Sequence, residues 1–369
     1  MSPRAPSLSP RRSRPRLVDK PVRGSIGNPY ANTARPWVKG EIHAHVCKAR
    51  NSSTTYDDGV PARTIYKDAA EEGLQFVCMS VDATHQQGGA DRFGDVGLGK
   101  KYDVIGIPGR EIQNNFFYPE DFISDYFHEA GAEYLHVLTI GEDGISLCLH
   151  PTYYELVRPK PGGGWNHIKK ALLSASSSST LGKLHVSGIE VYNGFTMRKL
   201  LDADRVYEYS DYDEHCWDEM LMAGRRYWGF CGNDSFFHSS NDLASFSPLG
   251  VTYALAPAGA TTEDIVQSLR LGRFYASTGV CPADTPLTAT VDGFRVQVEA
   301  RAATEVNWTA KIFQRIGRGW HLTSLHVPGS DRAVFTTQPA WRYIRVQCQS
   351  ISDPWQRPWL QPITNNAFF

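Results

Sequence analysis

The stretch Gly40-Glu41-Ile42-His43-Ala44-His45-Val46 carries the strongest structural signal in the sequence. It combines a short apolar run, typical of a buried strand, with two histidines at positions i and i+2. Residues at this spacing project from the same face of a strand, so the imidazoles of His43 and His45 can share one metal ion. We therefore predict a strand over residues 38–46 that leads into a metal site.

Short apolar runs continue along the chain and alternate with segments of helical periodicity. Further strands are expected at 76–81, 104–107, 134–140, 145–149, 187–192 and 227–231, and helices at 60–73, 119–130, 167–175 and 261–271. Gly73 is a stop signal for the first helix, and a threonine caps the last one. Strands that alternate with helices are typical of parallel βαβ units, and about seven such units indicate a barrel.

The pattern changes after Gly279. Alternating strands without helices are expected at 288–291, 294–300, 307–313, 333–336 and 341–348. This pattern of short strands without helices is typical of a small antiparallel β-sandwich. We predict three parts: a basic tail over 1–36, a barrel over 37–281 and a sandwich over 282–369.

Composition and charge narrow the classes of function. Of 369 residues, 41% are hydrophobic, which is enough to bury a large core. The first 25 residues hold seven basic residues and one acidic residue, which leaves 31 basic and 38 acidic residues for the rest. The Pro, Ser and Arg content of this tail favours disorder, with a transit peptide as the alternative. The acidic remainder argues against a nucleic-acid groove.

Cysteine usage and hydropathy bear on the compartment. Seven cysteines are widely spaced and none forms a Cys-x-x-Cys pair, which favours reduced thiols in the cytoplasm. No run of eighteen apolar residues occurs, so we expect no membrane-spanning helix.

Residue types that bind metals recur near the ends of the predicted strands. They are His85 after 76–81, Glu111 after 104–107, His150 after 145–149, and Asp234 and His238 after 227–231, while His136 lies within 134–140. The carboxyl ends of the strands of a parallel barrel converge, so residues far apart in sequence meet there. Imidazoles and carboxylates that meet in this way predict a multinuclear hydrolytic site.

These residues carry a family resemblance. Five segments resemble, in the same order, motifs of the polymerase and histidinol phosphatase (PHP) superfamily of metal-dependent hydrolases: His43-Ala44-His45, Asp82-Ala83-Thr84-His85, Pro108-Gly109-Arg110-Glu111, His150-Pro151, and Gly232-Asn233-Asp234 with His238. Residues 188–194, 272–279 and 355–363 resemble the branch that contains a carbaryl hydrolase and ends in a small β domain.

The resemblance implies a distorted (β/α)7 barrel that holds two or three divalent ions, manganese, zinc or iron. It implies a set of metal ligands: His43, His45, His85, Glu111, His136, His150, Asp234 and His238. The expected catalytic residues are Glu111, His150 and Asp234. Of these, Glu111 would bridge two ions. Four nearby residues are candidates for binding substrate: Arg110, Arg198, Lys199 and Asn193.

Three functions follow as hypotheses. The first is a hydrolase that uses a metal-bound hydroxide to cleave a phosphoester of a small molecule. The second keeps the metals but acts on a carboxylic ester, carbamate or amide, in keeping with aromatic residues near the predicted site: Phe116, Phe117, Tyr118, Tyr153, Tyr154, Phe236 and Phe237. The third is an inactive PHP-fold binding protein, suggested by Thr84, where the motif usually has Asp, and by the long spacing from Asp234 to His238. The oligomeric state is left open.

Overall fold

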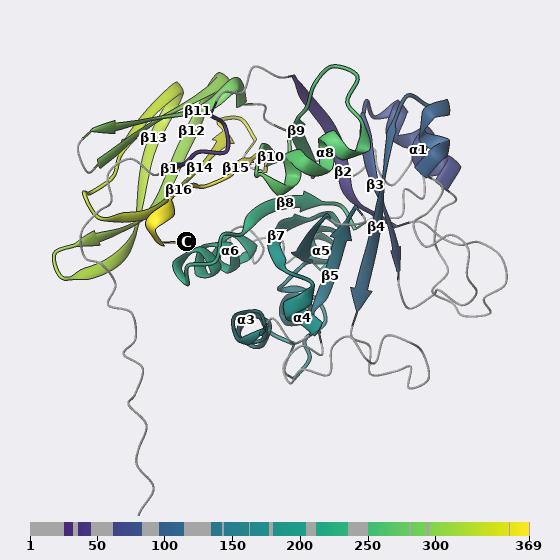
Figure 1. Cartoon of the computed structure of the whole chain (residues 1–369), viewed down its shortest axis with the longest axis horizontal. Coiled ribbons are helices and arrows are strands. Elements are labelled where there is room, and N and C mark those ends of the chain that lie inside the picture. Colours follow the sequence, from purple (N-terminus) through teal and green to yellow (C-terminus); the bar gives the residue numbers. More distant parts are fainter. Residues whose placement is uncertain are drawn as a thin grey trace, which may run out of the picture.

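The structure is a computed structural model of the whole chain (Figure 1). It describes residues 26–31, 36–45, 62–82, 96–113, 134–141, 144–161, 163–176, 180–203, 212–234, 250–279, 282–292, 295–353 and 355–368. Among these residues no helix is long and apolar enough to cross a membrane.

Sixteen strands of the described chain belong to one hydrogen-bonded sheet. They are β1 (Ile26–Gly27), β2 (Trp37–His45), β3 (Phe76–Asp82), β4 (Ile105–Gln113), β5 (His136–Ile140), β6 (Ile145–Cys148), β7 (Val186–Asn193), β8 (Trp228–Gly232), β9 (Val251–Leu255), β10 (Phe274–Ser277), β11 (Pro282–Asp292), β12 (Arg295–Ile316), β13 (Gly319–Thr336), β14 (Trp341–Ser350), β15 (Pro358–Leu360) and β16 (Ile363–Asn365). Every strand expected from the sequence overlaps one of these.

The helices are fewer and shorter. They are α1 (Ala62–Glu71), α2 (Tyr153–Leu156), α3 (Trp165–Ser174), α4 (Thr180–Lys183), α5 (Gly194–Asp202), α6 (Tyr212–Met222) and α8 (Thr262–Arg270), with 3₁₀ turns η2 (Val96–Lys101) and η4 (Asn366–Phe368). The helices expected at 60–73, 167–175 and 261–271 are confirmed, whereas 119–130 lies outside the described residues. Gly73 follows α1 with a φ of +67°. Thr261 and Asp264 form a capping box at the start of α8.

The expected (β/α)7 barrel followed by a separate sandwich is wrong. The main path of the sheet runs in the order β1-β16-β14-β15-β10-β9-β2-β3-β4-β5-β6-β7-β8, and β12, paired with β11 and β13, branches from β14. Among the described strands, β8 is hydrogen-bonded along its length to β7 alone. The sheet is therefore open and curled rather than a closed ring. The strands after residue 282 join it through β15, which pairs with both β10 and β14.

Strand direction departs from the parallel pattern for physical reasons. β5 and β6 are antiparallel because only residues 141–144 connect them, and a parallel pair needs a crossover of a dozen or more residues. β5 is also antiparallel to β4. β9, which the sequence analysis did not identify, pairs antiparallel with β2 at the position where a barrel would close. The pairs β2–β3, β3–β4, β6–β7 and β7–β8 are parallel, as expected.

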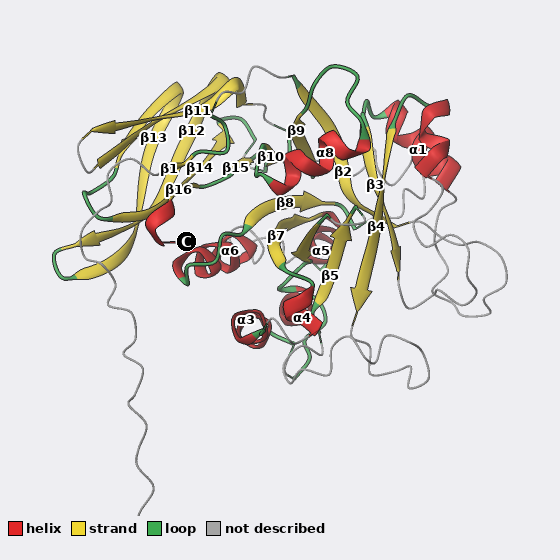
Figure 2. Cartoon of the chain, in the orientation of Figure 1, coloured by secondary structure: helices red, strands yellow, loops and turns green. Residues whose placement is uncertain are grey.

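The two faces of the curled sheet are covered differently. Ile265 and Leu269 of α8 pack with Phe76, Leu147 and Phe230 in one apolar cluster. Alternate residues of β6 and β8, Cys148 and Cys231, face the other way and belong to a cluster with residues of α3 and α6, which lie on one side of β7 and β8 (Figure 2). The sequence alternation therefore places one set of side chains in the cluster with α8 and another in the cluster with α3 and α6.

The part of the chain expected to be a tail contributes to the fold where it is described. β1 pairs with β16, and Tyr30 is buried with its hydroxyl donating to the Phe274 carbonyl at 2.7 Å. Residues 1–25 and 32–35 lie outside the described residues. The domain boundaries at 36 and 281 stay predictions.

A buried ion pair ties α6 to the C-terminal strands. The Arg345 guanidinium of β14 donates to both carboxylate oxygens of Asp218 at 2.9 and 2.8 Å, and Lys311 of β12 lies 3.1 Å from the same carboxylate. Burial disfavours the charged form of Asp218, but Arg345 and Lys311 outweigh it and hold the pKa of Asp218 below its usual range.

This depressed pKa predicts how stability depends on pH. The contribution of Asp218 is fully present above its unfolded pKa of about 3.9 and is lost as pH falls through the lower folded value. The difference in unfolding free energy between wild type and Asp218→Asn should therefore be largest above about pH 5 and shrink toward pH 3. Urea unfolding followed by tryptophan fluorescence measures it, with exposed Asp292→Asn as the control. A difference that does not change with pH would contradict the linkage.

Candidate metal centre

The polar side chains of the candidate site lie where several strands end at one edge of the sheet. His43 and His45 come from the end of β2, and Asp234 lies two residues after the end of β8. Glu111 lies near the end of β4. His136 is the first residue of β5, but β5 runs antiparallel to β4, so its start lies at the edge where β4 ends. Strand reversal therefore delivers His136 to the same place.

Two local features of the backbone shape this edge. The pairing of β2 with β3 shifts register between Glu41 and Ala44, where β2 has one extra residue. Such a bulge re-aims side chains and is common beside functional sites. His150 and Asp234 both have positive φ values, 23° and 48°, which non-glycine residues rarely adopt. Strain of this kind persists where surrounding contacts hold it, and it concentrates at functional sites.

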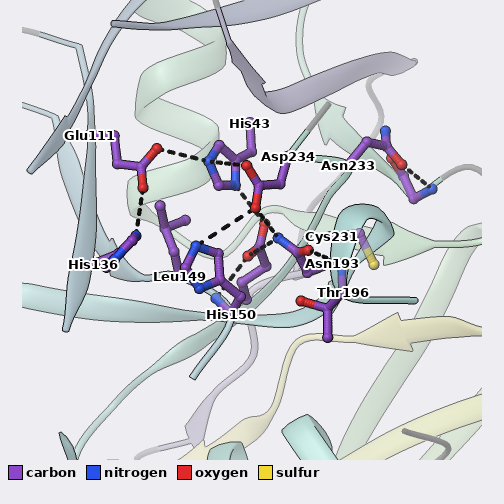
Figure 3. A network of polar contacts seen from close by, with 12 residues as sticks. His43, Glu111, His136, Leu149, His150, Asn193, Thr196, Cys231, Asn233 and Asp234 are labelled. Atoms are coloured by element: carbon purple, nitrogen blue, oxygen red, sulfur yellow. Dashed lines mark hydrogen bonds and ion pairs between the residues drawn. The ribbon is translucent and has the colours of Figure 1, made fainter. Parts of the chain in front are cut away.

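Glu111 lies at the centre of the cluster. Its Oε2 is 3.3 Å from His43 Nε2 and its Oε1 is 2.8 Å from His136 Nδ1 (Figure 3). The same Oε2 is 3.0 Å from His45 Nε2. The Glu111 side chain is only 1% exposed. One buried carboxylate thus faces three imidazoles.

Asp234 approaches the same imidazoles with its own carboxylate. Its Oδ1 is 2.9 Å from His45 Nε2 and 3.5 Å from His43 Nε2, and its Oδ2 is 3.7 Å from His150 Nε2. The donor atoms of His43, His45 and Glu111 all lie within 4.8 Å of one another, as do those of Glu111, His136 and His150. Nitrogen and oxygen donors at this spacing fit two adjacent divalent ions that share Glu111.

Buried groups hold these ligands in place from behind. Glu190 accepts from the His150 backbone N–H at 2.9 Å and from Asn193 Nδ2 at 2.8 Å, and its other oxygen is 3.0 Å from His43 Nδ1. Thr152, two residues after the strained His150, donates a hydrogen bond to Asp213 of α6 at 2.8 Å. A carboxylate on the second nitrogen of a histidine orients the ring and fixes which nitrogen faces the metal.

Glu41 is a functional candidate that the sequence analysis missed. It is buried and accepts hydrogen bonds from the backbone N–H groups of His43 and Asn233, and from the Asn233 amide. These contacts join the end of β2 to the end of β8, although the two strands form no ladder. The alternation that placed His43 and His45 on one face also includes position 41, and that was the signal available in the sequence.

The electrostatics follow from carboxylates and imidazoles confined together. Burial opposes protonation of His45, but Glu111 and Asp234 outweigh it and raise the pKa of His45 to about 10. Burial opposes ionisation of Asp234, yet the neighbouring histidines lower the pKa of Asp234 to about 2. In the same way the pKa of His43 is held well above, and that of Glu111 well below, the ordinary value. Protonated imidazoles must lose their protons to bind a metal ion.

Burial shifts the pKa values of Glu41 and His150. Burial raises the pKa of Glu41 to about 7, against the hydrogen bonds that it accepts. Burial and the neighbouring His136 lower the pKa of His150, so this imidazole is neutral and ready to donate its lone pair.

The structure brings six of the eight predicted metal-ligating residues together: His43, His45, Glu111, His136, His150 and Asp234. His85 and His238 lie outside the described residues. The assignment of all eight residues as metal ligands stays a prediction.

The four predicted substrate-binding residues are placed differently from one another. Asn193 donates to Asp234 at 3.3 Å and so lies within the cluster. Strand alternation puts Arg110 on the face of β4 opposite to Glu111. Lys199 is exposed, with its ammonium 5.1 Å from the centre of the Phe195 ring. Arg198 lies in α5, and its side chain is outside the description.

Comparisons with known proteins give little beyond this geometry. No protein-family model matches the chain, and no curated protein matches it. Among solved structures, it is similar to a two-domain protein from Bacteroides vulgatus ATCC 8482 that contains a predicted PHP-like metal-dependent phosphoesterase. The TM-score is 0.42 at 13% sequence identity, over 89% of this chain and 95% of that chain. A similarity of this size does not assign the chain to a family.

Proposed function

We propose that this chain is a PHP-like, metal-dependent hydrolase that cleaves a phosphoester of a small molecule. The observation that carries the proposal is the convergence of four histidines and two carboxylates at one edge of the sheet. The donor atoms of the histidines and Glu111 form two overlapping groups, each within 4.8 Å, and Asp234 lies 2.9 Å from His45 and 3.7 Å from His150. Imidazole and carboxylate ligands suit manganese, zinc or iron.

The residues present fit two ions, and a third would need ligands beyond the described set. His43 and His45 would hold one ion and His136 and His150 the other, with Glu111 shared between them. When bound, such ions polarise the phosphoryl group and make a water molecule a better nucleophile at neutral pH. Asp234, with its low pKa, stays ionised and holds His45 and the neighbouring imidazoles in orientation.

Glu190 and Asn193 keep the geometry of this centre. Glu190 contacts His43 through one oxygen and the His150 backbone through the other, so it couples the two halves of the cluster. Asn193 bridges Glu190 and Asp234. We assign Glu111, His150 and Asp234 the catalytic roles on these contacts. Asn193 is fully buried, so we assign it the positioning of Glu190 and Asp234.

The remaining expectations are part of the proposal. Membership of the branch that contains a carbaryl hydrolase remains a proposal based on sequence motifs. A cytoplasmic location agrees with the five described cysteines, which are buried and form no disulfide: Cys78, Cys148, Cys216, Cys231 and Cys348. The partner is a small ester, with no nucleic acid or membrane expected.

Metal removal tests the proposal. Chelation should lower hydrolysis of bis(p-nitrophenyl) phosphate or p-nitrophenyl phosphate by about 100-fold or more, and readdition of manganese, zinc or iron should restore it. Elemental mass spectrometry should find about two ions per chain, lost in a His43→Ala, His45→Ala double variant. The matched control replaces two other histidines, His215 and His321, with Ala.

The same assay separates the competing functions. The alternative substrates are carboxylic esters, carbamates and amides, which would be hydrolysed at the same metal site. A higher kcat/KM on p-nitrophenyl acetate than on both phosphates would favour them. A folded protein that binds no metal after reconstitution would overturn the enzyme proposal and favour a binding protein.

A further inference from the structure

Two aromatic side chains lie beside the histidine cluster at the edge where the strands end. Tyr153 opens α2, three residues after His150, and Phe195 lies in the first turn of α5, two residues after Asn193. These helices follow β6 and β7, which are parallel neighbours. The residues that follow parallel strands lie at the same edge of a sheet, where ligands bind in open α/β sheets.

The rings form a continuous row that begins at the metal centre. Tyr153 meets His150 edge-on, with ring centroids 5.6 Å apart and an interplanar angle of 62°. Phe195 follows, with its centroid 6.0 Å from that of Tyr153 and its plane tilted by 32°. Tyr154 flanks Tyr153 at 5.1 Å, and its hydroxyl is 3.3 Å from His136 Nε2.

Exposure distinguishes this row from the aromatic core. Phe230 and Phe274 stack at 4.4 Å and are fully buried. Tyr153, Tyr154 and Phe195 are only half-buried, so each of these residues keeps part of its surface accessible. Aromatic area that stays accessible next to a polar centre is typical of a small-molecule site.

A positive charge lies at the outer end of the row. Lys199 is one turn after Phe195 in α5, and its Nζ is 5.1 Å from the centroid of that ring. The ammonium is attracted by the negative face of the ring, so it belongs to the aromatic row rather than to the histidine cluster.

We propose that Tyr153 and Phe195 form the subsite for the organic group of the substrate, and that this group is a planar aromatic ring. The inference rests on the proposed function, because it places the scissile group at His150 and the ring on the two side chains that follow. Offset and tilted ring pairs bind more tightly than the same area of saturated carbon, since the edge of one ring meets the negative face of another.

Two phosphonates that differ only in ring saturation test this subsite. Phenylphosphonate and cyclohexylphosphonate carry the same anionic group, and neither is hydrolysed, so the reactivity of the leaving group does not enter. Titration calorimetry on the full-length, manganese-loaded protein should give a Kd about 10-fold lower for phenylphosphonate. Metal content is measured for each protein so that the ratio is compared at equal loading.

Variants test whether the Phe195 ring sets the preference. Phe195→Leu, which leaves the Tyr153 contact with His150 in place, should reduce the ratio of the two Kd values to about 3 or less. Tyr153→Phe keeps the ring and should keep the ratio. Trp320→Leu removes a half-buried aromatic side chain that stacks on Phe313 in the C-terminal strands, and serves as the matched control.

The outcomes separate the subsite from the function. Equal affinities in wild type, an unchanged ratio in Phe195→Leu, or no binding of either phosphonate would overturn the subsite, whatever the hydrolysis assay shows. Loss of the phenyl preference in Phe195→Leu, with the preference kept in Tyr153→Phe and Trp320→Leu, would establish the subsite. Absence of metal-dependent ester hydrolysis, with the phenyl preference intact, would overturn the hydrolase and leave an aromatic binding site.

Discussion

Replacing Glu111 with glutamine is expected to remove metal from the whole cluster and to lower kcat/KM for phosphoester hydrolysis by about 1,000-fold or more. Glu111 belongs to both groups of potential metal ligands, whereas each histidine belongs to one. Its two oxygens lie within 3.3 Å of three imidazole nitrogens. Loss of several kcal/mol of transition-state stabilisation corresponds to this fall in rate.

The substitution preserves shape and removes charge. A glutamine amide would present an N–H group where the carboxylate had a lone pair, so one side of the cluster could not bind a cation. Glu299→Gln is the matched control, because Glu299 lies on β12 and pairs with the exposed residues Arg301 and Arg332. Two retained metal ions in Glu111→Gln, by elemental mass spectrometry, would show that Glu111 is not the shared ligand.

Much of the site could be predicted because strand geometry is local. Alternation along β2 places His43 and His45 on one face, and the structure has them 5.0 Å apart between ring centroids. Glu111, His150 and Asp234 were identified because each follows an apolar run, and strand ends do meet at one edge. These inferences needed only the positions of the strand ends and the rule that the carboxyl ends of parallel strands meet.

The barrel prediction failed because pairing is not local. The apolar run at 251–255 is a strand as short as those that were recognised, but its antiparallel pairing with β2 depends on where the chain returns after β8. The antiparallel pairing of β10 with β15 joins residues more than eighty positions apart in the sequence. The hairpin between β5 and β6 is the exception: four residues cannot hold a crossover helix, so its direction could have been read from the sequence.

Buried polar groups behind the site were missed for a related reason. Glu41 stands in the decisive motif, but its partners are backbone groups of His43 and Asn233, and only the curl of the sheet brings β8 to β2. Asp213, in α6, likewise accepts a hydrogen bond from Thr152, which is distant in the sequence. Sequence patterns indicate which side chain faces inward, and the tertiary fold determines what that side chain contacts.

Replacing Arg345 with methionine is expected to lower the free energy of unfolding by about 3–5 kcal/mol. Arg345 is 1% exposed, binds both oxygens of Asp218 and lies 3.5 Å from Glu214. Methionine would leave these buried carboxylates with Lys311 as a weaker partner, 3.1 Å from Asp218 and 3.7 Å from Glu214. Stacking of the guanidinium on Trp217, at 4.8 Å, would also be lost.

A matched control and a double variant separate burial from charge. Arg332→Met removes an arginine that pairs with Glu299 at 2.7 Å but is 58% exposed, so its loss should cost less than about 1 kcal/mol. Arg345→Met combined with Asp218→Leu removes both charges and leaves Glu214 with Lys311, so it should be more stable than Arg345→Met alone. Urea unfolding of the four proteins measures this. Equal losses for Arg332→Met and Arg345→Met would mean that burial does not set the strength of the pair, and that α6 is held to the C-terminal strands by apolar packing alone.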